Sequence, residues 1–129
     1  MSAYELIRAH YDASDRGDLD GMLAPLGPQS AWTEAAGFPY AGTYVGPDAV
    51  VAGVFGRIAA DWDGYRFTLE DLIDGGDRVV GVGTYTGTCK ATNKPMRARV
   101  AHVWTVADGV VATFEQFVDT VPVAQAMEA

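Results

Sequence analysis

The two histidines are the side chains that change charge most readily near neutral pH, and both fall among apolar residues. His102 alternates with Trp104 and Val106 on one face of the run AHVWTV, residues 101–106. His10 is followed by Tyr11 on the apolar stripe of a predicted helix. A buried imidazole needs a hydrogen-bond partner or a cavity to face. The spacing therefore indicates either a satisfied core histidine or a hydrogen-bond donor in a pocket.

A glycine-rich strand is the second unusual feature. In the run RVVGVGTYTGTC, residues 78–89, the glycines Gly81, Gly83 and Gly87 share one face with Tyr85. Glycines in the middle of a strand either let a sheet bend around a helix or leave a hollow beside it. In the second case Tyr85 would form a polar wall of the hollow. The two interpretations are compatible, because a bent sheet readily encloses a cavity.

The elements that must position these residues follow from periodicity and turn signals. The expected order is a helix over 3–16, a short helix over 18–26, a strand over 31–35, a loop over 37–46, a helix over 47–61, strands over 65–73, 78–89, 96–106 and 110–118, and a short closing helix after 119. The last four strands are joined by hairpin signals and are therefore antiparallel. This order predicts one α+β domain over residues 1–129.

The turn after Val106 decides which residues lie beside His102. A two-residue Asp108–Gly109 turn would place Glu115 on the face of His102. A three-residue turn would place Phe114 and Gln116 there instead. The residues alone leave both registers open, because a one-residue slip moves every side chain to the other face.

Four segments together resemble the SnoaL-like branch of the nuclear transport factor 2-like superfamily: HYDASDRGD, WTE, GDRVVGVGTYTGT and HVWTVADGVVATFEQFVDT. This superfamily includes ketosteroid isomerase, scytalone dehydratase, limonene epoxide hydrolase and the polyketide cyclases. The resemblance implies a cystatin-like cone, in which helices pack on a strongly bent, mainly antiparallel sheet around one pocket. It favours the three-residue turn, with Gln116 pointing inward.

The resemblance also assigns roles to residues. Glu34 falls at the position of the isomerase's general base, and His102 at that of its oxyanion-stabilising acid, where polyketide cyclases have a histidine. His10, beside Tyr11, falls at the position of the isomerase's catalytic tyrosine. A carboxyl beside Trp32 and Trp104 would be poorly hydrated, which raises its pKa towards the useful range of a general base.

The chain also departs from its relatives. Epoxide hydrolases need an arginine and an aspartate where this chain has Gly83 and Tyr85, so epoxide hydrolysis is not expected. Both they and the cyclases carry an essential aspartate where this chain has Gln116. Asp119 is expected to cap the closing helix, and Cys89 receives no role.

The predicted catalytic pair is therefore Glu34 and His102. The predicted substrate-binding residues are His10, Tyr11, Trp32, Phe55, Tyr85, Trp104, Phe114 and Gln116. The aromatic members of this set are also ordinary core residues. No metal site and no cofactor are expected, because the histidines and acids are too few and irregularly spaced to form a ligand set.

Composition and surface pattern indicate which binding partners and which cellular location to expect. The net charge of −8 argues against nucleic acid or an anionic membrane as the main partner. A single cysteine and the lack of a signal segment or a long apolar run favour a cytoplasmic protein. The other face of the sheet carries Val80, Val82, Ala101, Val103, Thr105 and Phe117. This face is apolar enough to predict a homodimer formed through the convex side of the sheet.

Two functions remain open from the sequence. The first is a cofactor-free acid–base enzyme, isomerase-like or cyclase-like, which acts on a small hydrophobic molecule that bears a carbonyl group or is polycyclic. The second is a pocket protein that binds such a molecule without catalysis. Catalysis requires Glu34 and His102 to point into one cavity with room for a ligand between them.

Overall fold

Six strands form one bent sheet in the computed structural model, which describes all residues from 1 to 129. The strands are β1 (Leu26–Glu34), β2 (Gly42–Val45), β3 (Trp62–Gly75), β4 (Arg78–Cys89), β5 (Pro95–Ala107) and β6 (Val110–Val118). Their order across the sheet is β2-β1-β6-β5-β4-β3. Every neighbouring pair is antiparallel except β1 and β6, which are parallel. The expected α+β class and the mainly antiparallel sheet are confirmed.

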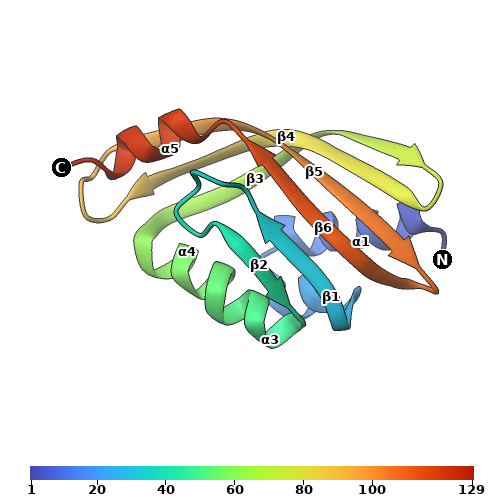
Figure 1. Ribbon diagram of the computed structural model, residues 1–129. Helices are drawn as coiled ribbons and strands as arrows, with labels where there is room; N and C mark the ends of the chain where they lie inside the picture. Colours follow the sequence, from blue (N-terminus) through green and yellow to red (C-terminus); the bar gives the residue numbers. More distant parts are fainter.

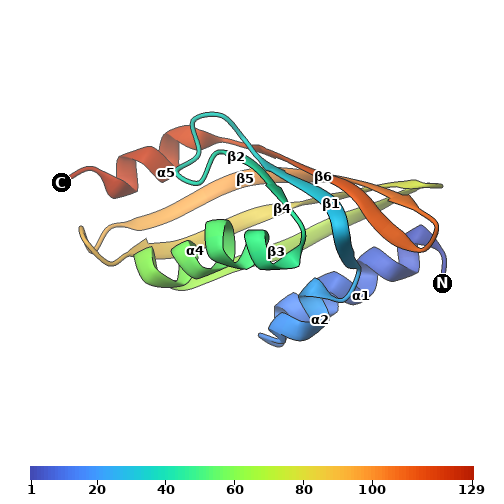
Figure 2. The same ribbon diagram turned by 60° about the horizontal axis from the view of Figure 1, so that its bottom comes forward.

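The helices close the concave face of this sheet. They are α1 (Ala3–Asp15), α2 (Leu19–Leu23), α3 (Pro47–Val50), a turn of π-helix (Val51–Phe55) and α4 (Gly56–Asp61), followed by α5 (Thr120–Met127). Figure 2 shows α1–α2 and α3–α4 on the same side of the sheet. The last helix, α5, lies at the end of the sheet away from the N-terminus (Figure 1) and packs against β5.

Local sequence signals explain most helix ends. The side chain of Ser2 accepts from the backbone N–H of Glu5 while Glu5 accepts from that of Ser2, which forms a capping box at the start of α1. Pro47 occupies the first turn of α3, where its missing N–H costs nothing. Asp119 accepts a hydrogen bond from the backbone N–H of Val121 and caps α5, as expected.

Two expected elements are corrected. The second helix ends at Leu23 rather than continuing to residue 26, because Leu26 already pairs with Val111 as the first residue of β1. The predicted loop over 37–46 contains the strand β2, whose Tyr44 pairs with Trp32. This edge strand is only four residues long, and flanking glycine and proline masked its pattern.

The turn between β5 and β6 also differs from the expectation. Asp108 and Gly109 both have positive φ (53° and 76°), and Ala107 pairs with Val110, so the turn has two residues rather than three. The register then shifts by one residue at Ala112, because Thr105 pairs with Thr113 while Val106 pairs with Val111. This β-bulge turns the same residues of β6 inward as a three-residue turn would have done, although each residue of β5 pairs two positions further along β6.

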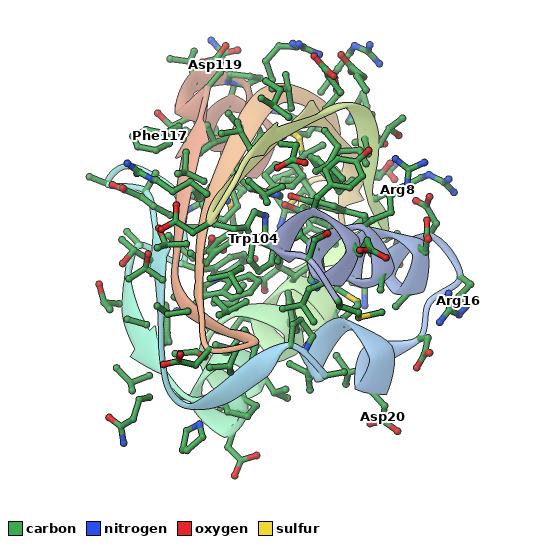
Figure 3. All side chains as sticks on the ribbon, turned by 90° about the vertical axis from the view of Figure 1, so that its right-hand side faces the viewer. Arg8, Arg16, Asp20, Trp104, Phe117 and Asp119 are labelled. Carbon is green, nitrogen blue, oxygen red and sulfur yellow. The ribbon has the colours of Figure 1, made fainter.

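As a result, the inward-facing residues of β5 and β6 are those that were expected. His102 pairs with Gln116 and Trp104 pairs with Phe114. Trp104 points from the sheet towards α1, whereas Phe117 points away from the helices and is 51% exposed (Figure 3). Glu115 is exposed and does not lie beside His102 on the concave face.

Candidate functional site

A cavity of about 700 Å³ lies between the concave face of the sheet and the helices α1, α2 and α4. This volume is within the range of pockets that bind small organic molecules. Aromatic side chains from β1, the π-helical turn Val51–Phe55, β3, β4 and β6 line the cavity: Trp32, Phe55, Trp62, Tyr65, Phe67, Tyr85 and Phe114. The polar lining includes Glu34, His10, Tyr11 and His102. The pocket is therefore mainly apolar, with a few polar groups that converge on it.

One row of residues across the sheet places the polar groups. Gly81 on β4 pairs with His102 on β5, which pairs with Gln116 on β6. Thr33 on β1 pairs with Glu115, which puts Glu34 beside Gln116 in the same row. Side chains in a row across a sheet lie on the same face. The row therefore directs Glu34, Gln116 and His102 towards the helices.

Two tyrosines hold the imidazole of His102. Its Nδ1 lies 2.8 Å from the hydroxyl of Tyr11, and its Nε2 lies 2.6 Å from the hydroxyl of Tyr85. The indole N–H of Trp104 donates to the Tyr11 hydroxyl at 2.9 Å, and the amide of Gln116 donates to the Tyr85 hydroxyl at 3.0 Å. His102 is thus a hydrogen-bonded histidine that also borders the cavity.

His102 is neutral in the folded protein. Burial, with a smaller contribution from the nearby His10, lowers the pKa of its imidazole to about 3. A neutral imidazole has one N–H and one lone pair, so it accepts a hydrogen bond from one tyrosine and donates to the other. The tyrosine that accepts from His102 already accepts from Trp104 or Gln116. Its own hydroxyl proton is therefore not used in the contact with His102, and both tyrosines border the cavity.

Glycine makes room for this arrangement. A Cβ atom on Gly81 would overlap the hydroxyl oxygen of Tyr11. A Cβ on Gly83 would lie 2.7 Å from the ring of Phe67. The glycine face of β4 is therefore filled by aromatic side chains from α1 and β3 rather than left as an open hollow. Tyr85, on the same face, does border the cavity as expected.

Glu34 is the unpaired acid of the site. It is 4% exposed, its carboxyl makes no hydrogen bond, and it borders the cavity. Burial raises the pKa of its carboxyl, and although the nearby indole of Trp32 offsets a smaller part of this effect, the pKa reaches about 8. The Trp32 N–H approaches this carboxyl but completes no hydrogen bond with it. At neutral pH Glu34 is therefore mostly a neutral carboxylic acid.

Eight of the ten predicted site residues line the cavity. Trp104 and Gln116 do not; they lie behind the lining, where each donates to a tyrosine. Gln116 also accepts from the backbone N–H of Ala35 at 3.0 Å, so its amide is fully oriented. Their roles in substrate binding stay predictions, but their contacts are those of residues that orient the tyrosine hydroxyls.

Sequence reasoning missed the contribution of β3. Tyr65 and Phe67 border the cavity, together with Trp62 at the start of the strand. Burial raises the pKa of Tyr65 well above its ordinary value, and the neighbouring Tyr85 and Glu34 raise it further. The alternation of Tyr65, Phe67 and Leu69 with polar residues was the signal that could have revealed this face.

Other kinds of site find little support in the geometry. No group of three His, Cys, Asp or Glu side chains is placed to hold a metal ion. Cys89 is a buried free thiol. None of the helices is both long enough and apolar enough to cross a membrane.

Comparison with known proteins agrees with this architecture. Residues 7–114 match the SnoaL-like domain family. The chain belongs to this family. No protein of curated function matches the chain.

Solved structures extend the likeness over the full length of the chain. An NTF2-like protein from Burkholderia thailandensis E264 is 50% identical, with a TM-score of 0.98 over 100% of this chain and 99% of that one. An NTF2-like protein of unknown function from Burkholderia pseudomallei K96243 is 30% identical, with a TM-score of 0.89 over the whole of both chains. TerC, which was co-crystallised with polyporic acid, is 27% identical, with a TM-score of 0.85 over 98% of both chains.

Proposed function

We propose that this SnoaL-like protein is a cofactor-free acid–base enzyme that moves a proton next to a carbonyl group. Its substrate is a small hydrophobic molecule, and the reaction is isomerase-like or cyclase-like. One observation carries the proposal: Glu34, whose carboxyl has no hydrogen-bond partner, borders the same apolar cavity as Tyr11 and Tyr85, one of which keeps a hydroxyl proton to donate. A base and a hydrogen-bond donor around one cavity are the layout that such a proton transfer needs. Ketosteroid isomerase pairs a carboxylate base with hydrogen-bond donors in the same way, so the pattern itself is a known one.

In this mechanism Glu34 removes the proton. Its ionised form takes a C–H proton from the carbon beside the carbonyl and later returns a proton to another position. A base whose pKa lies near the working pH combines a useful ionised fraction with a strong tendency to take a proton. The pKa of about 8 gives Glu34 this property. The neutral form that predominates below this pKa lets an apolar ligand enter without burying a charge.

The tyrosines stabilise the oxygen. As the C–H proton leaves, negative charge develops on the carbonyl oxygen, which accepts a hydrogen bond from Tyr11 or Tyr85. A preorganised donor of this kind contributes about 10² or more in rate. Both nitrogens of His102 are engaged by the tyrosine hydroxyls. We therefore assign His102 to positioning the donor, while the tyrosine hydroxyl touches the substrate.

The second candidate is a binding protein without catalysis. It is favoured by the neutral state of the pocket, because an uncharged Glu34 can donate a hydrogen bond to a ligand carbonyl. The co-crystal of TerC with polyporic acid supports small-molecule binding in a relative that is 27% identical. Both candidates predict that carbonyl compounds stabilise the protein, so binding alone does not separate them.

A proton-exchange experiment separates the two. Alkyl aryl ketones that carry a C–H beside the carbonyl and that stabilise the protein in a thermal shift screen are incubated with the protein in D₂O, and loss of the α-proton signal is followed by NMR. The enzyme proposal predicts catalysed exchange that Glu34→Gln reduces by about 10² to 10⁴. The matched control Glu115→Gln alters an exposed carboxylate outside the cavity and should leave exchange unchanged. Binding of ketones with no catalysed exchange would favour the second candidate.

A further inference from the structure

His10 has a side chain whose hydrogen bonding is only half complete. It lies on α1 and is 5% exposed, with its ring against those of Trp104 and Trp32 at centroid distances of 4.7 and 6.4 Å. Its Nδ1 lies 2.8 Å from the backbone carbonyl oxygen of Met22 in α2. Its Nε2 has no hydrogen-bond partner within the protein, and the side chain borders the cavity.

The contact with Met22 fixes the tautomer of His10. A carbonyl oxygen only accepts hydrogen bonds, so the proton of the ring must be on Nδ1. Burial lowers the pKa of His10 to about 4, which keeps the ring neutral at physiological pH. Nε2 therefore carries a lone pair, and the side chain that bears it borders the cavity. No donor within the protein reaches this lone pair, so a ligand in the cavity can supply the O–H or N–H that it accepts.

This acceptor has the opposite polarity to the other polar groups of the pocket. The free tyrosine proton and the neutral carboxyl of Glu34 are donors, and both suit a carbonyl oxygen. Nε2 of His10 instead suits a group with an O–H or N–H. The resemblance placed a tyrosine hydroxyl donor at this position in the isomerase, and the structure puts an acceptor there. The pocket thus has two ends that suit different functional groups.

We propose that the ligand of this cavity carries a hydroxyl group in addition to its carbonyl, and that this hydroxyl donates to Nε2 of His10. The inference rests on the proposed function, which places the carbonyl near Glu34 and the tyrosines. His10 packs beside Trp32. Trp32 lies two residues before Glu34 on β1, and two residues of a strand span roughly 7 Å. An aromatic ring with a hydroxyl para to a carbonyl spans a similar length.

Three matched probes test this assignment: 4-hydroxybenzophenone, benzophenone and 4-methoxybenzophenone. The methyl ether fills the same space as the phenol but cannot donate. Affinities are measured by tryptophan fluorescence at about pH 6, where the phenol keeps its proton and His10 is neutral. We expect the wild-type protein to bind the phenol about three- to tenfold more tightly than the other two. In His10→Phe this preference should disappear, while the affinity for benzophenone stays within about threefold.

Nitrogen-15 NMR of the histidines gives a second test, which uses the wild-type protein and therefore does not require that the His10→Phe variant folds. The free protein should show His10 with a protonated Nδ1 and an unprotonated Nε2. The phenol should move the Nε2 resonance, and benzophenone should not. Equal affinity for the three probes, or a proton on Nε2, would overturn the assignment of His10 and leave the role of Glu34 untouched. Failure of all three ketones to bind would overturn both the ligand class and the proposed function.

Discussion

Replacing Glu34 with glutamine should change how the stability of this protein depends on pH. In the unfolded chain the carboxyl ionises with a pKa near 4.5, and in the folded protein burial raises its pKa to about 8. Between these values the folded state holds a proton that the unfolded state has released. Raising the pH through this window therefore favours unfolding. The difference of 3.5 pKa units corresponds to a loss on the order of 5 kcal/mol, most of it present by pH 8.

Glutamine cannot ionise, so Glu34→Gln should escape this loss. Its stability relative to wild type should rise by about 4 kcal/mol between about pH 4.5 and pH 8.5, or roughly 15 °C in Tm. Any cost of fitting the amide is the same at both pH values and cancels. Titration of His10 and His102 is common to both proteins and cancels as well. Urea unfolding at the two pH values measures the difference, with Glu115→Gln as the exposed control. If the difference in unfolding free energy between Glu34→Gln and wild type stays constant across this pH range, burial does not raise the pKa of the Glu34 carboxyl.

The structure also predicts the effects of substitutions at three other positions. Gly81→Ala should destabilise the protein by about 1–3 kcal/mol in urea unfolding, because the new methyl group meets the Tyr11 hydroxyl; unchanged stability would contradict this packing. His102→Ala should slow ketone proton exchange by about 10² with a smaller effect on ligand affinity, and equal rates would remove His102 from the mechanism. We also propose a homodimer through the convex face around Phe117, which is 51% exposed. Light scattering should show a dimer at roughly tens of micromolar that Phe117→Lys converts to monomer, and a wild-type monomer would contradict the interface.

Elements of the fold with strong local signals could be predicted from the sequence. Alternating residues and turn dipeptides indicate the four long strands and their antiparallel pairing. The β-bulge at Ala112 could not be predicted, because no residue type marks where a strand gains an extra residue. Strand β2 was missed because its pairing with β1 is a contact between segments, and its own four residues carry no clear alternation.

The sequence indicates which residues of the site point towards the helices, but not which of them border the cavity. Alternation puts Trp104 on the face of His102, and the family resemblance puts Gln116 there. Neither tells that both residues lie behind the tyrosines rather than in the cavity wall. The pairing of His102 with Tyr11 joins residues 91 positions apart, so no local pattern contains it. The same holds for the carbonyl of Met22, which fixes the tautomer of His10.

The pH dependence of ketone proton exchange, measured beside the titration of Glu34 itself, tests the central claim most directly. The carboxyl carbon of Glu34 is followed by carbon-13 NMR while the exchange rate is measured on the same protein. If Glu34 is the base, the rate rises with pH as the carboxyl ionises, and both curves share a midpoint near the pKa of about 8. An exchange rate that does not change through this range, or a Glu34 carboxyl that titrates near its ordinary pKa, would contradict the account.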